Sequence, residues 1–516
     1  MSTKKIKAMK KIINYSILLV LFSFSMSCEK GLDALNENQT NPTSVDPVFQ
    51  LNNAIINMSF PVGTLIFDIA IVQQVVSPNG GVLAGGNFNV DNKGLTNTPW
   101  PGYYRNVIRN VHDIIVRTEA VPERANLLNM ARILQAYCFM VLTDEYGDIP
   151  YFEGGAGYSD QIFFPKYDAQ KDIYDDLIKE LSEASAALSA AGRIEGGDLL
   201  YAGDIAKWKK FGYSLLLRAG MRLSKIDAPK AQTTVQAAVA GGVITANADN
   251  AYMRHDINYQ SPINNTLNST EAANFYLAKP FVDLLKSTSD PRLSSIAIRY
   301  VGATSGPTQT PANGSTVASL QIGMPMGKDN ATVVAAAAAD GLASFYEYSQ
   351  VDRRRMAKTT APVFFVTAAQ TQLLLAEARQ RGWITTSTVD AYYNAGVRAH
   401  MEQMATYDAG SAISSAAIDT YLTTNPFVPA NALSQINTQY WIASFLNGPE
   451  AFANFRRSGF PALTPNPYPG KEITGTFIRR LSYPSSEISS NNSNVQEAIT
   501  RQGPDNLDTR VWWDKP

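Results

Sequence analysis

Apolar side chains recur at helical spacing through residues 129–151 and again through residues 170–188. Positions i, i+3, i+4, i+7 and i+8 fall on one face of an α-helix. We expect the first helix to end near Tyr146, because Gly147 favours the left-handed terminal conformation and Pro150 cannot continue a helix. Two such helices must bury their apolar faces on each other and on further helices, so the pattern predicts a mostly α-helical protein. The first stripe consists of Met130, Ile133, Leu134, Tyr137, Cys138, Val141 and Leu142.

Similar periodicity predicts further helices on both sides of this hairpin. Residues 244–350 interrupt the helical pattern, because they are rich in Asn, Ser, Thr, Gly and isolated aromatics. We expect a loop-rich insert there, containing one helix at about 271–287. No strict 34-residue period is visible. The remaining predicted helices lie at about 48–76, 104–119, 208–222, 363–381 and 387–405.

The first 27 residues are predicted to be a secretory signal peptide. Five lysines between residues 4 and 11 precede a short apolar run from Ile12 to Phe24, which is too short to span a bilayer comfortably. Small residues then lead to Cys28, and this pattern resembles the lipobox of bacterial lipoproteins, although Ser25 stands where Leu is usual. We expect Cys28 to be lipidated and residues 28–47 to form a tether. An ordinary signal peptide followed by an incidental Cys is the alternative.

Processing would change the charge of the chain. The whole sequence has 44 basic and 45 acidic residues, and removing the five leader lysines leaves 39 against 45, a net charge near −6. Such a protein has no basic surplus for nucleic acid or an anionic bilayer. No second apolar run reaches membrane-spanning length, so we expect the mature protein to be anchored to a membrane without crossing it. Cys138, on the apolar helix face, is expected to be a buried free thiol.

The helix that closes in Leu-Thr-Asp-x-Tyr-Gly-Asp-Ile-Pro-Tyr at 142–151 carries one distinctive motif, and Leu-Leu-Ala-Glu-Ala at 374–378 is part of another. These motifs resemble those of the SusD/RagB family of Bacteroidetes outer-membrane lipoproteins. The C-terminal fifth carries the most specific one, with Arg480 and Trp513 following it in the family's order. The similarity covers essentially the whole mature chain. The C-terminal motif includes Gln439, Trp441, Glu450, Arg456, Arg457 and Pro461.

The resemblance implies a single α-helical domain over residues 48–516, built from tetratricopeptide-like helix pairs with the insert at 244–350 laid across them. It also implies a cell-surface lipoprotein of the outer membrane that captures a glycan or another oligomeric nutrient. The ligand would pass to a TonB-dependent, SusC-like barrel, with this protein acting as its lid. No cofactor, metal or catalytic step is implied. Peptide binding stays open within this reading, and a structural partner of the barrel without a ligand site is a rival to it.

Candidate ligand residues are expected in the loops, where family members differ. Aromatic faces stack on the apolar C–H surfaces of sugars, while Asn, Gln and Asp bond the hydroxyls. A long Gly/Asn-rich loop precedes the helix at 104, and the segments 252–276 and 344–348 supply the same residue types. We therefore predict that ligand contacts involve Asn87, Trp100, Tyr259 and Tyr346.

A surface glycoside hydrolase is the alternative from another class. Asp144, Glu145 and Asp148 are carboxylates close in sequence, and a carboxylate pair can serve a glycosidase. They sit where a helix ends, so turn formation is the favoured interpretation. Arg456 and Arg457 could grip an anion bidentately, but structural ion pairing is favoured. Glycine-rich residues 323–329 lack the spacing and the Ser or Thr of a phosphate loop.

Overall fold

The computed structural model describes residues 9–10, 45–61, 63–80, 86–270 and 272–516. Cys28 and nearly all of the predicted leader and tether lie outside these residues. Contacts group residues 47–516 into one unit, and everything below concerns this unit. Its N-terminal part contains α3 (Pro47–Asn57), α4 (Asp68–Ile71), β1 (Val75–Val76), α6 (Lys93–Thr96), α7 (Pro99–Tyr103) and α8 (Arg109–Thr118).

The predicted hairpin is present and forms the centre of the unit. Helix α9 (Ala125–Tyr146) ends where expected, with Gly147 at φ 82° and its N–H donating to the Thr143 carbonyl at 2.8 Å. The partner helix α10 (Gln170–Ala187) packs on α9, but it follows a connection over residues 147–169 instead of a tight turn. The Asp148 carboxylate accepts from the Gln170 N–H at 2.8 Å and so ties the two helix ends together.

Helix α9 is a core helix, although it is apolar enough to be confused with a membrane span. Among the described residues, the segment Pro122–Tyr146 has the length and mean hydropathy, 1.2, to cross a bilayer. This differs from the expectation that no further run reaches that length. Its apolar window is 78% buried inside the unit, because α8, α10 and α11 pack around it.

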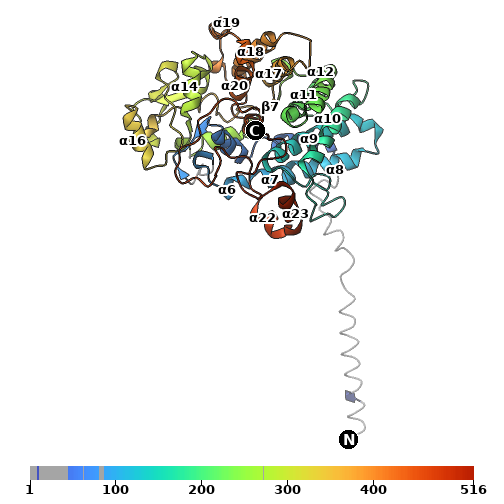
Figure 1. Ribbon diagram of the computed structural model, residues 1–516. Coiled ribbons are helices and arrows are strands. Elements are labelled where there is room, and N and C mark those ends of the chain that lie inside the picture. The colour runs from blue at the N-terminus through green and yellow to red at the C-terminus, as the bar shows by residue number, and fades with distance from the viewer. Residues whose placement is uncertain (1–8, 11–44, 62, 81–85, 271) are drawn as a thin grey trace. The chain divides into compact units, whose positions relative to one another are not determined.

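Successive helices continue the scaffold as packed neighbours (Figure 1). Helix α11 packs on both α10 and α12, and α17 packs on both α18 and α20. This arrangement confirms the predicted fold class, a mostly α-helical scaffold of helix pairs with a loop-rich insert. The helices are α11 (Ile205–Arg222), α12 (Ala228–Gly241), α17 (Ala368–Gln380), α18 (Val389–Tyr407), α19 (Ser415–Thr424), α20 (Ala432–Ala443), α21 (Gly448–Ser458), α22 (Ser485–Ser490) and α23 (Asn492–Gln502).

The region between α12 and α17 contains short helices and most of the strands. Strand β1 pairs antiparallel with β3, β2 with β7, and β4 lies between β5 and β6. The β1–β3 pair joins this region to the N-terminal part of the unit, and the other two sheets lie within the region. The elements are β2 (Ala251–Met253), α13 (Pro262–Leu267), β3 (Tyr276–Leu277), α14 (Lys279–Ser287), α15 (Arg292–Ile296), β4 (Ala297–Tyr300), β5 (Gly314–Ser315), α16 (Thr332–Ala339), β6 (Gln350–Val351) and β7 (Val363–Val366).

Two helices begin later in the chain than predicted. The helix predicted at 363–381 starts at Ala368, because residues 363–366 form strand β7. All four residues of β7 are buried. Thr367 then caps α17, and its side chain and that of Gln370 form a capping box. The helix predicted at 271–287 starts at Lys279, because β3 occupies 276–277. The predicted helix at 48–76 is also divided, into α3, a π-helical turn at Gly63–Phe67 and α4.

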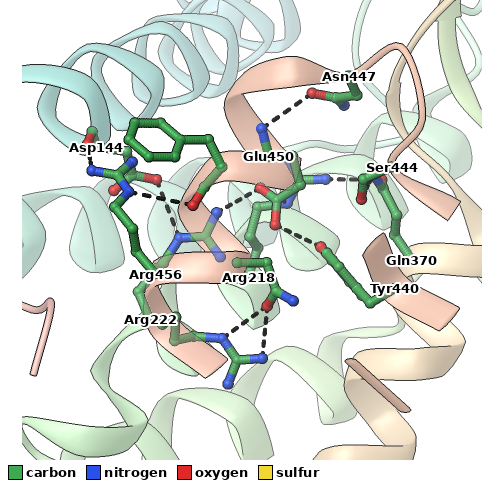
Figure 2. A network of polar contacts seen from close by, with 12 residues as sticks. Asp144, Arg218, Arg222, Gln370, Tyr440, Ser444, Asn447, Glu450 and Arg456 are labelled. Carbon is green, nitrogen blue, oxygen red and sulfur yellow. Dashed lines mark hydrogen bonds and ion pairs between the residues drawn. The ribbon is translucent and has the colours of Figure 1, made fainter. Parts of the chain in front are cut away.

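A buried polar network joins α9, α11, α20 and α21 (Figure 2). The Glu450 carboxylate forms ion pairs with Arg222 at 2.6 Å and Arg218 at 3.1 Å, and it accepts from the Tyr440 hydroxyl at 2.7 Å. Arg222 also pairs with Asp144 at 3.2 Å. The network thereby links four helices from distant parts of the chain. The shared face of Arg218 and Arg222 therefore serves ion pairing, as predicted.

The Arg456–Arg457 pair is built into the same core. Arg457 pairs with Glu377 of α17 at 2.7 Å, with both side chains about 1% exposed. Arg456 instead donates to the backbone carbonyls of Asp144 at 2.7 Å and Arg479 at 2.8 Å. The predicted structural role of the pair is confirmed, through an ion pair for one arginine and carbonyl contacts for the other.

Candidate ligand-binding site

A surface hollow of about 490 Å³ lies where the segment after β1, the turn before α16 and the segment after α21 meet. We call it the Tyr468 hollow. Its volume is within the roughly 300–1,000 Å³ of small-molecule sites. Its walls come from three parts of the chain more than a hundred residues apart, and its lining includes Phe88, Asp329, Asn330 and Tyr468.

Two aromatic rings form one side of this hollow. The Phe88 and Tyr468 rings lie 4.4 Å apart between centroids, tilted by 34°. Phe88 is only 4% exposed, whereas Tyr468 is half-buried and lines the hollow. The packed Phe88 ring therefore fixes the position of Tyr468, whose accessible ring surface is available to a ligand.

Asn87 holds the three walls together, although its own side chain is fully buried. Its carboxamide donates to the carbonyls of Ser77 at 2.6 Å and Lys328 at 3.3 Å, and it accepts from the Gly327 N–H at 3.0 Å. The Asn466 side chain donates to the Asn87 carbonyl. A buried carboxamide satisfied on both ends makes such a junction rigid. Asn87 thus joins the walls of the hollow from a buried position, and its contact with a ligand stays a prediction.

Polar groups also line the hollow. The Asp329 carboxylate accepts from the Thr332 N–H at 2.8 Å and its hydroxyl at 2.7 Å, and these bonds lower the pKa of Asp329 below its usual range. Asn330 is exposed beside it, and its carboxamide has no hydrogen-bond partner among the described residues. A hollow lined by an aromatic ring, a carboxylate and a free carboxamide can hold a ligand that has both an apolar face and hydroxyl or amide groups.

The other three predicted ligand residues lie elsewhere. Trp100 is 6% exposed in α7, where its ring packs against Tyr104 at 5.0 Å, Tyr146 at 5.2 Å and Tyr167 at 5.8 Å. In this structure it is a packing residue, because Pro99 starts a helix that turns the ring into the core. Its role in ligand binding stays a prediction that this burial does not favour.

Tyr346 and Tyr259 are more accessible. Tyr346 stacks on Phe345 at 4.3 Å and packs against a small satellite core around Tyr300. Tyr259 is 56% exposed and lines a separate hollow. Among the described residues, no hydrogen bond or ring contact joins any two of the four predicted residues, so the structure does not bring them into one site.

The three clustered carboxylates are all buried, and two of them, Asp144 and Asp148, have ion-pair partners. Asp144 is buried, pairs with Arg222 and accepts from the Tyr174 hydroxyl at 2.5 Å and the Trp513 indole at 2.9 Å. The void beside it measures about 10 Å³, the space of a single water. Glu145 is fully buried as well. Because all three carboxylates are buried, the structure gives the glycosidase alternative no exposed carboxylate pair among these residues.

The three histidines have packing or hydrogen-bonding roles. His400 is buried beside Arg292, and its burial lowers its pKa well below the usual value. His112 contacts the Ser159 hydroxyl at 3.0 Å, and His255 contacts that of Ser59 at 3.0 Å. Within the described part of the chain, no group of three or more His, Cys, Asp or Glu is placed to hold a metal ion.

Comparison with known proteins identifies the family. The model of a SusD-like family, described as "Starch-binding associating with outer membrane", matches residues 38–484. The chain belongs to this SusD-like family. The resemblance drawn from the motifs is thereby confirmed, and the family description associates its members with the outer membrane. A comparison with curated protein sequences finds no match.

Solved structures agree with this membership of the SusD-like family. A structure named as a chitin-binding protein is 30% identical, with a TM-score of 0.81 over 91% of this chain and 100% of its own. A Bacteroidetes AC2a SusD-like structure is 26% identical, with a TM-score of 0.79 over 92% and 100%. A SusD homologue from Bacteroides uniformis, at 24% identity and a TM-score of 0.74 over 91% and 99%, shares the fold.

Sequence reasoning missed the residues that line the Tyr468 hollow. Phe88 directly follows the predicted Asn87, so the predicted Gly/Asn-rich loop contributes to the lining of this hollow. Tyr468 lies in a proline-rich stretch, Pro465 to Pro469, which kept it out of every predicted helix. No local signal in the sequence connects these two rings, because they lie in distant parts of the chain and meet only through tertiary packing.

Proposed function

We propose that this protein captures a neutral glycan at the cell surface and passes it to a TonB-dependent barrel of the SusC type. The glycan class that we propose is an oligomer of N-acetylglucosamine, the repeating unit of chitin. The site that we propose is the Tyr468 hollow. The protein holds the glycan and makes or breaks no bond in it.

The tilted pair of Phe88 and Tyr468 rings is the observation that carries this proposal. A pyranose ring offers an axial C–H face that packs on an aromatic surface, and its equatorial hydroxyl and acetamido groups point sideways toward polar side chains. Asp329 and Asn330 line the same hollow and supply an acceptor and a carboxamide for these groups. The 30% identical structure is named for chitin binding, which supports the choice of sugar class.

The charge of the rim favours a neutral ligand. Hydrogen bonds from Thr332 keep Asp329 ionised, and no Lys or Arg is among the described residues that line the hollow. A glycan carrying carboxylates or sulfates would meet like charge there without a compensating cation. Chitin oligomers carry no charge and have amide groups that can donate to the Asp329 carboxylate.

The membrane and barrel parts of the proposal rest on the family and the N-terminus. The family description associates its members with the outer membrane, and Cys28 would carry the lipid anchor. A tether over residues 28–47 would let the folded unit reach a neighbouring transporter while staying attached. We place the barrel contact on the helical surface of the unit.

Isothermal calorimetry of the full chain in detergent tests the capture role. The ligands are N-acetylglucosamine tetramer, maltotetraose and a neutral tetrapeptide, each titrated into wild type and Tyr468→Ala. We expect binding of the N-acetylglucosamine tetramer, weakened about tenfold in the variant, which corresponds to about 1.4 kcal/mol and is typical of one lost ring contact. Tyr158→Ala is the matched control, because Tyr158 is 84% exposed and does not line the hollow.

Each other outcome has a defined meaning. Binding of maltotetraose alone would keep glycan capture and replace the sugar class. Binding of the peptide alone would establish nutrient capture of the alternative kind. Unchanged affinity in Tyr468→Ala would remove the Tyr468 hollow as the site. No binding of any of the three would contradict the capture of a neutral oligomer.

A further inference from the structure

A second hollow, of about 320 Å³, lies between the C-terminal end of α3, the beginning of the α7–α8 segment and the loop before α13. We call it the Tyr259 hollow. It shares no lining residue with the Tyr468 hollow. Its described lining contains carboxamides, a hydroxyl, an imidazole and proline rings, and no Asp, Glu, Lys or Arg. A cavity of this composition suits an uncharged polar ligand.

A short chain of hydrogen bonds fixes the polar groups at its base. The His255 Nδ1 lies 2.9 Å from the Tyr259 carbonyl oxygen, which can only accept, so Nδ1 carries the ring hydrogen. Burial lowers the pKa of His255, which keeps the ring neutral. Its Nε2 is then an acceptor, and the Ser59 hydroxyl 3.0 Å away donates to it. The lone pairs of Ser59 consequently remain for a donor group on a ligand.

The rim of the Tyr259 hollow carries groups whose hydrogen-bonding capacity is unused. Among the described residues, the Gln260 carboxamide and the Tyr259 hydroxyl have no hydrogen-bond partner, and Gln260 is exposed. The Asn106 oxygen accepts a long bond of 3.4 Å from Arg105, while its NH₂ group is not engaged by the described residues. The Tyr259 ring is 56% exposed. One aromatic face therefore stands beside two free amide groups and one free hydroxyl acceptor.

We propose that the Tyr259 hollow is a second binding site for one or two neutral sugar units, which stack on Tyr259, accept from the amides of Asn106 and Gln260 and donate to Ser59. This inference rests on the proposed glycan capture, and it adds a second point of contact on the same molecule. Two separate sites would let one chain of sugars be held at two places, which raises the apparent affinity for long glycans above that for short ones.

Photoaffinity labelling of the full chain in detergent tests this site. The probe is N,N′-diacetylchitobiose carrying a diazirine, and labelled peptides are mapped by mass spectrometry with and without excess unmodified disaccharide. We expect competed labelling within residues 255–262 that falls at least fivefold in Tyr259→Ala and is unchanged in Tyr468→Ala. Labelling around Phe88 and Tyr468 should show the opposite dependence. Tyr259 is exposed, so its replacement should leave the melting temperature unchanged.

The outcomes separate this inference from the proposed function. Competed labelling at the Tyr468 hollow with none in residues 255–262 overturns the second site and keeps glycan capture. Labelling in residues 255–262 that persists in Tyr259→Ala overturns the assigned contacts. The absence of competed labelling at both hollows overturns the second site together with the proposed sugar class. A Gln260→Ala variant gives an independent check, because it should also reduce labelling in residues 255–262.

Discussion

Replacing Glu450 by Gln tests the buried network that holds the scaffold together. Glu450 is 4% exposed and is the common partner of Arg218, Arg222 and Tyr440. Burial raises its pKa, and the two arginines lower it by more, so the carboxylate stays ionised. The variant keeps the shape of the side chain and removes its charge, which leaves two buried guanidinium groups with one fewer anion between them.

The expected loss of stability follows from the missing negative charge between the two buried arginines. Removing one partner of a buried ion pair costs about 3–5 kcal/mol. The unit spans Pro47–Pro516, and an unfolding entropy of about 2.1 cal/mol/K per residue gives roughly 1 kcal/mol/K for it. The melting temperature of Glu450→Gln should therefore fall by about 3–5 °C. Glu497→Gln is the control, because Glu497 is exposed and such changes stay within about 0.5 kcal/mol.

Differential scanning calorimetry at several pH values measures both the loss of stability in Glu450→Gln and the direction in which that loss changes with pH. A carboxylate whose folded pKa is lowered contributes stability that is complete above its unfolded value near 4.5 and is lost as the pH falls through the folded pKa. The gap between wild type and Glu450→Gln should thus be full at pH 7 and shrink in acid. A variant that melts with the Glu497→Gln control at pH 7 would refute this account of the network.

Three further substitutions or reactions test separate features. Burial raises the pKa of Glu145 to about 8, so the folded state retains a proton between pH 4.5 and 8, and wild-type stability should fall as the pH rises through this window. Denaturant titrations at pH 5.5 and 8 should show a smaller decline in stability for Glu145→Gln than for wild type. An equal decline in the two proteins counts against a protonated Glu145. In urea unfolding, Gly147→Ala should be about 1–3 kcal/mol less stable than wild type, because φ is +82° and the new Cβ would lie 2.2 Å from a side-chain oxygen. Gly196→Ala is the control, because a Cβ there meets open space and stability should change little. Cys138 is buried with a raised pKa, so a Cys28→Ser chain should react with Ellman's reagent only after unfolding, and rapid reaction of the native protein would contradict the burial.

Most of the scaffold could be predicted from the sequence because local patterns decide it. The end of α9 followed from Gly147 and Pro150, and the stripe from Met130 to Leu142 gave its buried face. Errors arose where an apolar run has no periodicity. Residues 363–366 are Val-Phe-Phe-Val, a run that is ambiguous between helix and strand, and pairing with β2 decides for a strand. The Thr367 capping box marked the true helix start.

The candidate site was less accessible to sequence reasoning than the scaffold. The Gly/Asn-rich loop contributes to the Tyr468 hollow, where Asn87 holds the walls together and the adjacent Phe88 lines the hollow. Trp100 was expected in the loop, but the short helix α7 turns it inward. The ring of Tyr468 arrives from a distant segment through tertiary packing, and one sequence contains no information on that pairing.

A crystal structure of the protein with N-acetylglucosamine tetramer bound would test the central claim most directly. We predict a sugar ring packed on Tyr468 in the Tyr468 hollow, with its hydroxyl or acetamido groups within 2.7–3.2 Å of Asp329 or Asn330. A tetramer bound at another surface, with the Tyr468 hollow left to solvent, would contradict the account.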